Sequence, residues 1–438
     1  MATGLETAQA IARALGENGF QAFLVGGCVR DLMLGRKPED YDISTDARPD
    51  QVLRIYPRAQ QIGAHFGVVL VDGVEIATFR SDLDYNDGRH PEQVSFETDP
   101  RMDVLRRDFS INALMLDPLD PTGGTEAVID YVGGLADLAS GTIRAIGDPI
   151  RRFEEDHLRM LRAIRFAARF GFTIAPGTFE AISRLHSNIG RISPERIRDE
   201  IVRILTEGGA RYGFELLDRS GLLQDILPEV AAMKGVEQPP EFHPEGDVWI
   251  HTLRMLEGLK KASPELAMGV LLHDVGKPPT FRIAERIRFD GHVEAGETIA
   301  RSILARLRFS HREAEQVIAL IGNHMRFGDV GRMRESTVKR FLRLDRFDEH
   351  LELHRLDCCS SHGHLDNYEF MKRLYEHVPV EEIKPLRLLT GNDLIGAGYL
   401  PGPEFSRMLE IVEDAQLEGR VGTKAEALEL VHEQFGGG

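Results

Sequence analysis

The sequence predicts an α+β protein, with a head of mixed strands and helices followed by an almost wholly helical remainder. Short apolar segments typical of strands alternate with helical patterns up to about residue 145. From about Pro149 the apolar residues recur at helical spacing, and glycine and proline breakers divide the helical part. We therefore expect four parts: a head (1–147), a helical connector (148–235), a helical domain (236–378) and a helical tail (379–438).

The composition limits the class of protein. Hydrophobic residues make up 42% and charged residues 28%, which are ordinary proportions for a multidomain chain of 438 residues. Three cysteines, two of them adjacent, form no disulfide framework, which favours a cytoplasmic location. No segment approaches the roughly 18 apolar residues of a membrane span. Because the net charge is −17, a site for nucleic acid must be a local basic groove on an acidic body.

The head begins with a predicted helix and a strand. Apolar residues lie at helical spacing across 6–18, and Ala22–Val25 is a short apolar strand. This strand leads directly into two glycines and a second helix that extends to about Leu34. Further strand-like segments follow: Val68–Val71, Val74–Phe79 and Leu114–Leu116.

The strand-to-helix junction carries the first chemical signal, the string Gly26-Gly27-Cys28-Val29-Arg30-Asp31. Two glycines let a phosphate approach the backbone, whose free N–H groups favour anions. Arg30 adds a forked cation one turn into the helix. The alternative is a tight turn in which the glycines serve packing alone.

The second signal is a pair of carboxylates, Asp40 and Asp42. Residues two apart on a strand point to the same face, so these side chains are expected to converge. A bound dication removes the repulsion between them, and oxygen ligands favour Mg²⁺. Two ions roughly 4 Å apart can activate an attacking hydroxyl and stabilise a departing pyrophosphate. A solvated acidic turn is the alternative.

The third and fourth signals are rich in arginine: RRDFSINA at 106–113 and EDHLR at 155–159. Arginines continue at spacings of three and four residues, which places them along one helical stripe: Arg159, Arg162, Arg165 and Arg169. Such a stripe is usually a solvated face. Because it follows the phosphate and metal signals, we expect it to face a triphosphate or an RNA backbone.

Taken in order, the four strings resemble the class II tRNA nucleotidyltransferase and bacterial poly(A) polymerase family over about residues 20–210. The resemblance implies a polymerase-β-like nucleotidyltransferase head that uses Mg²⁺, ATP and CTP and acts on tRNA with release of pyrophosphate. By position, Asp40 and Asp42 would hold the magnesium ions as catalytic residues. The residues implied to contact the nucleotide are Gly27, Arg30, Arg107, Asp156, Arg159, Arg162 and Arg165.

Within this implied set, Asp156 and Arg159, backed by Glu155, would pair with the edge of the cytosine or adenine base. A polymerase-β-like site has a third carboxylate, for which Glu75 on the strand after Val74 is a candidate. The alternative for Glu75, a surface residue on a strand, is the more frequent one.

Small features select among members of this family. The segment Gly63–Gly67 lacks the two basic residues typical of the poly(A) polymerases and resembles the tRNA-type version. The segment Asp82–Phe96 resembles the flexible loop of enzymes that add C, C and A, so full CCA addition is expected. Polyadenylation and CC-only addition stay open as alternatives. A non-catalytic RNA-binding protein is disfavoured, because metal-free carboxylates repel RNA phosphates.

A second constellation lies in the helical domain: His251, His273-Asp274, His292, His324 and Asp357. Its order resembles the HD phosphohydrolase superfamily. By position, His251, His273, Asp274 and Asp357 would be the main metal ligands, while His292 and His324 would serve a second metal or a phosphate. Mixed imidazole and carboxylate ligands suit Mn, Fe, Co or Ni.

Three interpretations of this domain stay open. It could be a phosphodiesterase or phosphatase, or a metal-binding scaffold for tRNA. The whole chain could also be a phosphohydrolase whose head only binds nucleotides. Near the C-terminus, Leu389–Ile395 and Pro401–Pro403 resemble a segment of HD-bearing members that contacts the tRNA elbow, with helical packing as the alternative. The sequence implies no protein partner.

Overall fold

The computed structural model describes residues 4–62, 67–83, 93–120, 124–241, 243–244 and 246–436. Two compact units make up the chain: Met1–Ala231 with Arg306–Arg308, and Ala232–Ala305 with Phe309–Gly438. The division after Ala231 lies close to the predicted boundary at 235. The first unit contains the predicted head and connector, and the second contains the predicted helical domain and tail. The finer division into four domains stays a prediction.

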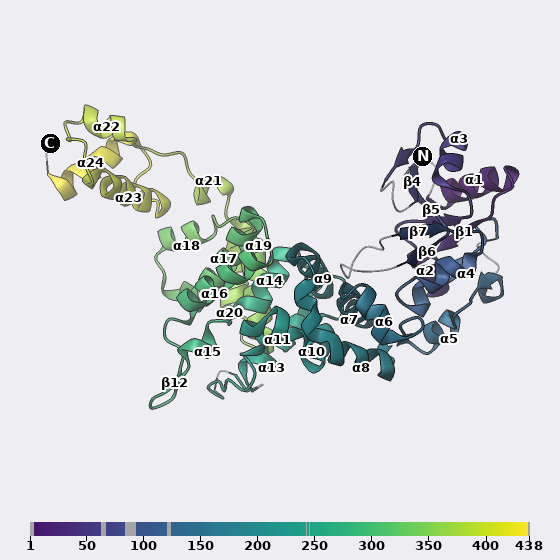
Figure 1. The fold of residues 1–438 in the computed structure, drawn as a ribbon. Helices are drawn as coiled ribbons and strands as arrows, with labels where there is room; N and C mark the ends of the chain where they lie inside the picture. The colour runs from purple at the N-terminus through teal and green to yellow at the C-terminus, as the bar shows by residue number, and fades with distance from the viewer. Residues whose placement is uncertain are drawn as a thin grey trace. The chain divides into compact units, whose positions relative to one another are not determined.

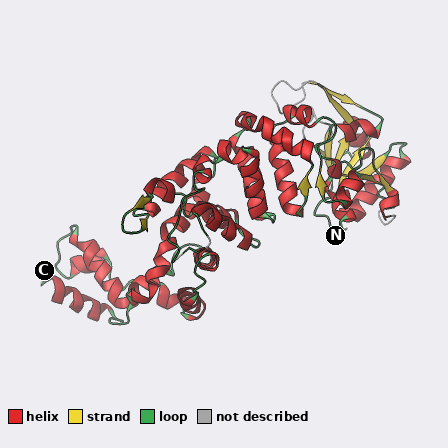
Figure 2. Cartoon of the chain, turned by 90° about the horizontal axis from the view of Figure 1, so that it is seen from below, coloured by secondary structure: helices red, strands yellow, loops and turns green. Residues whose placement is uncertain are grey.

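The predicted change from a mixed head to a helical remainder is confirmed (Figures 1 and 2). The strands of the first unit are β1 Ala22–Val25, β2 Asp42–Thr45, β3 Gln60–Gln61, β4 Val68–Val71, β5 Val74–Thr78, β6 Arg80–Leu83, β7 Gln93–Phe96, β8 Met115–Leu116, β9 Val128–Ile129, β10 Thr142–Ile143 and β11 Thr173–Ile174. The helices of the head are α1 Gly4–Glu17, α2 Gly27–Met33, α3 Pro49–Ile55, α4 Pro100–Leu105 and α5 Gly134–Ala139, with 3-10 turns at Ser110–Asn112 and Gly124–Ala127.

A seven-stranded sheet forms the centre of the head, in the order β3-β4-β5-β2-β1-β8-β9. The pair β2–β5 is parallel and the other neighbours are antiparallel. In the register of β1 and β2, Val25 lies opposite Asp42. The last residue before the glycine turn therefore faces the second carboxylate of the predicted pair.

Apolar burial explains the head's helices and its core. Helix α1 buries Ala8, Ile11 and Leu15 along one face, as its periodicity predicts. Directly after β5, Phe79 is fully buried in a cluster with Val25 and other apolar residues of the head. This cluster stabilises the position of β1, which leads into the glycine turn of the candidate site.

The connector consists of helices α6 Pro149–Glu155, α7 Leu158–Phe170, α8 Pro176–Leu185, α9 Pro194–Thr206, α10 Ala210–Ser220, α11 Leu222–Ile226 and α12 Pro228–Ala231, with a 3-10 turn at His186–Arg191. Helix α7 packs against α9 and α10. The turn between α9 and α10 passes very close to α7, because Gly209 adopts φ +70° and a Cβ there would lie 2.1 Å from the carbonyl oxygen of Ala168.

Among its described residues, the second unit is helical apart from one short hairpin, β12 Arg282–Ile283 and β13 Ile287–Arg288. Its helices are α13 Val248–Gly258, α14 Pro264–Leu272, α15 Lys277–Thr280, α16 His292–Arg306, α17 His311–Asn323, α18 Glu335–Phe341, α19 Phe347–Ser360, α20 Asp366–His377, α21 Val380–Ile383, α22 Gly391–Gly396, α23 Glu404–Leu417 and α24 Lys424–Phe435, with a 3-10 stretch at His324–Arg332. The helices of the tail have a small core of their own around Leu394 and Val431. Among the described residues, none of the helices has the length and apolar character needed to cross a membrane.

Gly209→Ala is expected to destabilise the first unit. The new methyl group would strain a left-handed backbone and overlap the Ala168 carbonyl, which together cost about 2–4 kcal/mol of unfolding free energy. Chemical denaturation measures this loss. Gly177→Ala is the matched control because a Cβ at Gly177 meets nothing within 4 Å. Equal stability of the two variants would contradict the close approach.

Candidate active site and metal centre

The glycine turn brings the backbone close to an arginine. Gly26 has φ +74° and ψ −130°, a backbone conformation that residues other than glycine rarely adopt. A Cβ on Gly26 would also lie 3.3 Å from Nη1 of Arg107. The predicted strand-to-helix junction is present, and helix α2 begins at the second glycine, Gly27. The first glycine is therefore required both by the turn and by the approach of Arg107.

Three carboxylates gather beside this turn. Asp42 is partly buried at the start of β2, Glu75 is exposed on β5, and Asp40 is exposed just before the strand. Burial and the negative charges of Glu75 and Asp40 raise the pKa of Asp42 to about 6, against the attraction of Arg107. Because the strand begins at Asp42, the alternation of side chains along a strand does not determine the direction of the Asp40 side chain. The negative charge of Asp40 nevertheless contributes to the raised pKa of Asp42. Repulsion of this kind is what a divalent cation relieves, so the carboxylates suit one.

A buried aspartate that the sequence analysis missed holds the two adjacent arginines. Asp103 is fully buried in α4, and its Oδ2 accepts hydrogen bonds from Nη2 of Arg107 at 2.8 Å and from Oγ of Ser44 at 3.2 Å. Its Oδ1 accepts from Nε of Arg106 at 2.8 Å. Burial opposes ionisation, but the charges of Arg107 and Arg106 lower the pKa of Asp103. The spacing of three and four residues from Asp103 to the arginines was the available signal.

Arg30 is buried and oriented on several sides. Its Nη1 donates to Oδ1 of Asn112 at 2.7 Å, and its Nε donates to Asp31 at 2.9 Å. The guanidinium also lies 4.7 Å from the ring centre of Phe170 in α7. Burial lowers the pKa of Arg30, against the attraction of Asp31. Arg30 thus joins α2 of the head to α7 of the connector.

Asp156 and Arg159 lie where α6 gives way to α7. Asp156 accepts from the backbone N–H of Leu158 at 3.0 Å through Oδ1, and from Nη2 of Arg196 at 2.8 Å through Oδ2. Arg159 donates to Glu155 at 2.5 Å. The expected backing of Arg159 by Glu155 is therefore present in the structure.

The arginine stripe on α7 is divided among acidic partners. Arg162 pairs with Asp108 at 2.6 Å, and this charge together with the hydrogen bond from Asn112 lowers the pKa of Asp108 to about 2 despite its burial. Arg165 is buried and pairs with Glu200 of α9 at 2.7 Å. The stripe is thus an ordered set of ion pairs and not a solvated face.

One cavity of about 600 Å³ in the first unit contains most of the predicted residues. The lining includes both glycines, nine arginines and three aspartates: Gly26, Gly27, Arg30, Asp42, Arg106, Arg107, Asp108, Asp156, Arg159, Arg162, Arg165, Arg169, Arg196 and Arg203 among others. Asp40 is not part of this lining. A basic cavity with the Asp42 carboxylate beside its glycine turn matches a polyphosphate accompanied by a divalent cation.

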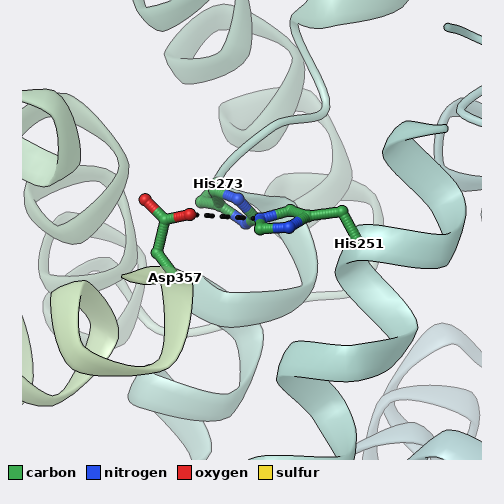
Figure 3. A group of neighbouring side chains, drawn as sticks. All are labelled: His251, His273 and Asp357. Atoms are coloured by element: carbon green, nitrogen blue, oxygen red, sulfur yellow. Dashed lines mark ion pairs between the residues drawn. The ribbon is translucent and has the colours of Figure 1, made fainter. Parts of the chain in front are cut away.

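The predicted ligands of the second unit form two groups. The first is His251, His273 and Asp357, whose side chains point toward one another from α13, the end of α14 and α19 (Figure 3). Nε2 of His251 lies 3.2 Å from Asp357. The second group is Asp274, His292 and His324, with their ligand atoms within 4.8 Å of one another.

Hydrogen bonds fix the histidines in the form that binds metals. The Nδ1 atoms of His273, His292 and His324 lie 2.9, 3.0 and 2.7 Å from the backbone carbonyl oxygens three residues earlier. These carbonyls require Nδ1–H, so each Nε2 lone pair is directed to the centre. Burial lowers the pKa of His324 to about 4, which keeps the ring neutral.

Asp274 shows why a cation fits between these rings. Its buried Oδ1 has no hydrogen-bond partner in the part of the chain that the structure describes, and Nε2 of His292 and of His324 each lie 3.9 Å from it. Its other oxygen receives a hydrogen bond from Nζ of Lys277 at 2.7 Å. The adjoining cavity, of about 500 Å³, is lined by both metal-ligand residues and cations, including Lys277, Arg286 and Arg288. A metal-bound phosphoester matches this combination.

Family models match three separate segments of the chain. Residues 22–144 match the family model for the Poly A polymerase head domain, residues 171–234 match the probable RNA and SrmB-binding site of polymerase A, and residues 248–350 match the HD domain. A solved Bacillus stearothermophilus CCA-adding enzyme in complex with CTP is 25% identical, with a TM-score of 0.74 over 99% of this chain and 98% of that one. The fold and the basic cavity thus define a nucleotidyltransferase.

Curated relatives narrow this class. A CC-adding tRNA nucleotidyltransferase of Thermus thermophilus is 34% identical over 93% of this chain and 92% of its own length. CCA-adding enzymes of Levilactobacillus brevis and Bacillus subtilis are 31% and 30% identical over 97% and 96% of this chain, and 96% and 95% of their own lengths. The chain belongs to the tRNA nucleotidyltransferase family that contains the CCA-adding enzymes, and the predicted family and fold class are confirmed.

Asp42→Asn is expected to stabilise the metal-free protein. The folded-state pKa of Asp42, about 6, lies above the ordinary value of 3.8. The carboxyl group therefore does not reduce the free energy of unfolding near pH 4, but it reduces it progressively as the pH rises from there to about 6. The variant should therefore melt about 2–4 °C higher than the parent at pH 8 in EDTA and at the same temperature near pH 4.

Differential scanning calorimetry measures this difference. Asp50→Asn is the control, because Asp50 is exposed and its pKa is lowered by Arg54. This change should give no gain in melting temperature at either pH. An Asp42→Asn variant that melts below the parent at pH 8 would show that the carboxylates do not repel one another.

Proposed function

We propose that this protein adds C, C and A to the 3′ end of tRNA from CTP and ATP and releases pyrophosphate. The observation that carries the proposal is the single cavity in which the glycine turn, Asp42, Arg107 and the Asp156–Arg159 pair lie together. The name of the Thermus thermophilus relative, a CC-adding tRNA nucleotidyltransferase, supports tRNA as the acceptor. A solved relative in complex with CTP supports a nucleoside triphosphate as the donor.

Asp40 and Asp42 are the residues proposed to hold Mg²⁺, and Glu75 is the proposed third carboxylate. When bound, Mg²⁺ lowers the pKa of a hydroxyl and neutralises charge on the triphosphate. The raised pKa of Asp42 in the absence of a cation supports this assignment, because it reflects clustered negative charge.

The protein's own groups bind and orient the nucleotide. The backbone at Gly27 and the guanidinium groups of Arg30 and Arg107 are proposed to contact the phosphates and the sugar. Asp156 accepts from the exocyclic amine that cytosine and adenine share, and Arg159 donates to the adjacent ring nitrogen. Uracil and guanine present a carbonyl oxygen in place of that amine, so an ionised Asp156 rejects them.

The extent of addition separates the relatives. The Thermus thermophilus relative adds CC, whereas those of Levilactobacillus brevis and Bacillus subtilis are CCA-adding enzymes. The segment that favours full CCA addition, Asp82–Phe96, lies partly outside the described residues, at 84–92. The segment that disfavours polyadenylation, Gly63–Gly67, lies outside them at 63–66. The first of these segments remains the basis of the proposal for full CCA.

Incubation with CCA-less tRNA, Mg²⁺ and labelled nucleotides measures the product directly. We expect three nucleotides to be added when CTP and ATP are both present, and two with CTP alone. Addition that stops after two nucleotides with both substrates present would establish a CC-adding enzyme. Extension of an oligo(A) primer with ATP, without use of CTP, would establish a poly(A) polymerase.

Asp42→Ala is expected to reduce nucleotide addition at least about 10³-fold, because a polymerase-type transfer depends on its metal ligands. Single-turnover addition of CTP to CCA-less tRNA measures this effect. Asp274→Ala in the second unit is the matched control and should retain addition within about threefold. If Asp42→Ala kept its activity, the head would be only a nucleotide-binding module.

A second activity is proposed for the HD domain, hydrolysis of a phosphoester at a transition-metal centre of Mn, Fe, Co or Ni. His251, His273, Asp274 and Asp357 are the proposed main ligands, with His292 and His324 at a second position. The Nδ1 hydrogen bonds of three of these histidines and the unpartnered Oδ1 of Asp274 support metal binding. The cationic lining of the adjoining cavity favours a phosphoester over a neutral substrate.

Asp274→Ala is expected to lower the metal content of the purified protein at least about tenfold, and to abolish hydrolysis of a chromogenic phosphomonoester or phosphodiester. Elemental analysis and the hydrolysis assay measure the two effects. Asp329→Ala, at an exposed residue outside this cavity, is the control. A metal-loaded parent with no hydrolysis of either substrate would favour the scaffold interpretation.

Three further assignments belong to this proposal. The tail segments around Leu394 and Pro401 are proposed to contact tRNA. The four-domain division at 147, 235 and 378 is retained. A cytoplasmic location is proposed because all three cysteines are free thiols and Cys359 is exposed, a state that a reducing compartment maintains.

A further inference from the structure

Arg196 lies beside the residue proposed to select the base, and the sequence analysis did not single it out. It is located in the first turn of α9, and its side chain lines the same cavity as Asp42 and Asp156. Its exposed fraction is 24%, so most of the side chain is removed from solvent. Because a charged side chain is costly to bury without partners, the contacts of Arg196 indicate its role.

One half of the guanidinium has a partner. Nη2 of Arg196 donates to Oδ2 of Asp156 at 2.8 Å. The other oxygen of Asp156 accepts from the backbone N–H of Leu158 at 3.0 Å. Since a carboxylate oxygen can accept two hydrogen bonds, Asp156 is held at both oxygens and keeps acceptor capacity for a ligand.

The other half has none. Nη1 of Arg196 is buried and has no hydrogen-bond partner in the described protein. A buried N–H without a partner is costly, so such a group in a structural ion pair would normally be satisfied by the protein. Its location in the cavity wall indicates that a bound ligand completes it.

Arg196 and Asp156 lie on different elements of the connector. Asp156 is a non-helical residue between α6 and α7. The backbone hydrogen bonds of the helices therefore do not fix the direction of its side chain. Leu158 N–H restrains one oxygen, but rotation about that bond still changes the direction of the other. The guanidinium from α9 removes this freedom, because it anchors Oδ2 from a different helix.

We propose that Arg196 is a positioning residue for base selection: it holds the Asp156 carboxylate in the direction that accepts the exocyclic amine of cytosine or adenine. The proposal rests on the proposed nucleotide addition and assigns to it a residue that determines specificity. Discrimination against UTP and GTP, more than the rate with CTP, depends on this contact. A carboxylate free to turn away from the base edge no longer rejects their carbonyl oxygen.

Steady-state addition to CCA-less tRNA with CTP or UTP tests this role. Arg196→Met keeps the length of the side chain and removes every donor. The ratio of kcat/KM for CTP to that for UTP should fall at least about tenfold, the effect of one base-edge hydrogen bond. Arg196→Lys restores one donor to Asp156 and should return the ratio to within about threefold of the parent. If Arg196→Met does not fold, as judged by its melting temperature, Arg196→Ala replaces it.

Arg203→Met is the matched control, because Arg203 lies on the same helix and lines the same cavity but makes no hydrogen bond to Asp156. It should weaken CTP and UTP equally and leave their ratio unchanged. An equal loss for both nucleotides in Arg196→Met would overturn the proposal and leave Arg196 as a source of positive charge. A parent enzyme that adds no nucleotide to tRNA would instead overturn the proposed function.

Discussion

Clustered negative charge beside the glycine turn is the constraint around which the head is built. The pairing of β1 with β2 places Asp42 opposite Val25, and the parallel pairing of β2 with β5 brings Glu75 into range. The sheet holds these carboxylates close together despite their repulsion. The buried core of the head offsets the free energy that this repulsion costs. Without a cation, the clustered carboxylates lower the stability of the folded protein, and a bound divalent cation removes this loss. The arrangement of the strands therefore favours binding of a metal ion.

Orientation of the arginines is the complementary constraint. A long cationic side chain is mobile unless an acid holds it, and here buried acids do so: Asp103 for Arg107, Asp108 for Arg162 and Glu200 for Arg165. Removal of one partner from such a buried pair costs about 3–5 kcal/mol, because the remaining charge is left unpaired. The head and the connector thus present a cavity whose donors are already directed, which lowers the cost of ordering them around the proposed nucleotide.

Much of this could be predicted from sequence. The glycine turn, Asp42 and the arginines of α7 follow from local strings with a specific spacing. Strand β1 and strand β4 were predicted with the bounds that they have, because apolar runs flanked by breakers are local signals. The HD residues were predicted from their order along the chain, and the structure brings them together in two groups.

Other features depend on tertiary structure and have no local signal. Arg196 meets Asp156 across 40 residues, and nothing in the string around Arg196 indicates that contact. Asp40 was assigned to a strand that begins two residues later, at Asp42. The choice of the Nδ1–H form in the HD histidines depends on backbone carbonyls that only the folded helices provide.

We propose above all that Asp40 and Asp42 jointly bind divalent ions beside a triphosphate. A crystal structure of the protein with Mn²⁺ and a non-hydrolysable CTP analogue tests it most directly, through the anomalous scattering of manganese. We expect at least one manganese peak at about 2.0–2.3 Å from carboxylate oxygens of both aspartates, next to the phosphates near Gly27. Manganese bound to the triphosphate alone, with both carboxylates more than about 4 Å away, would contradict it.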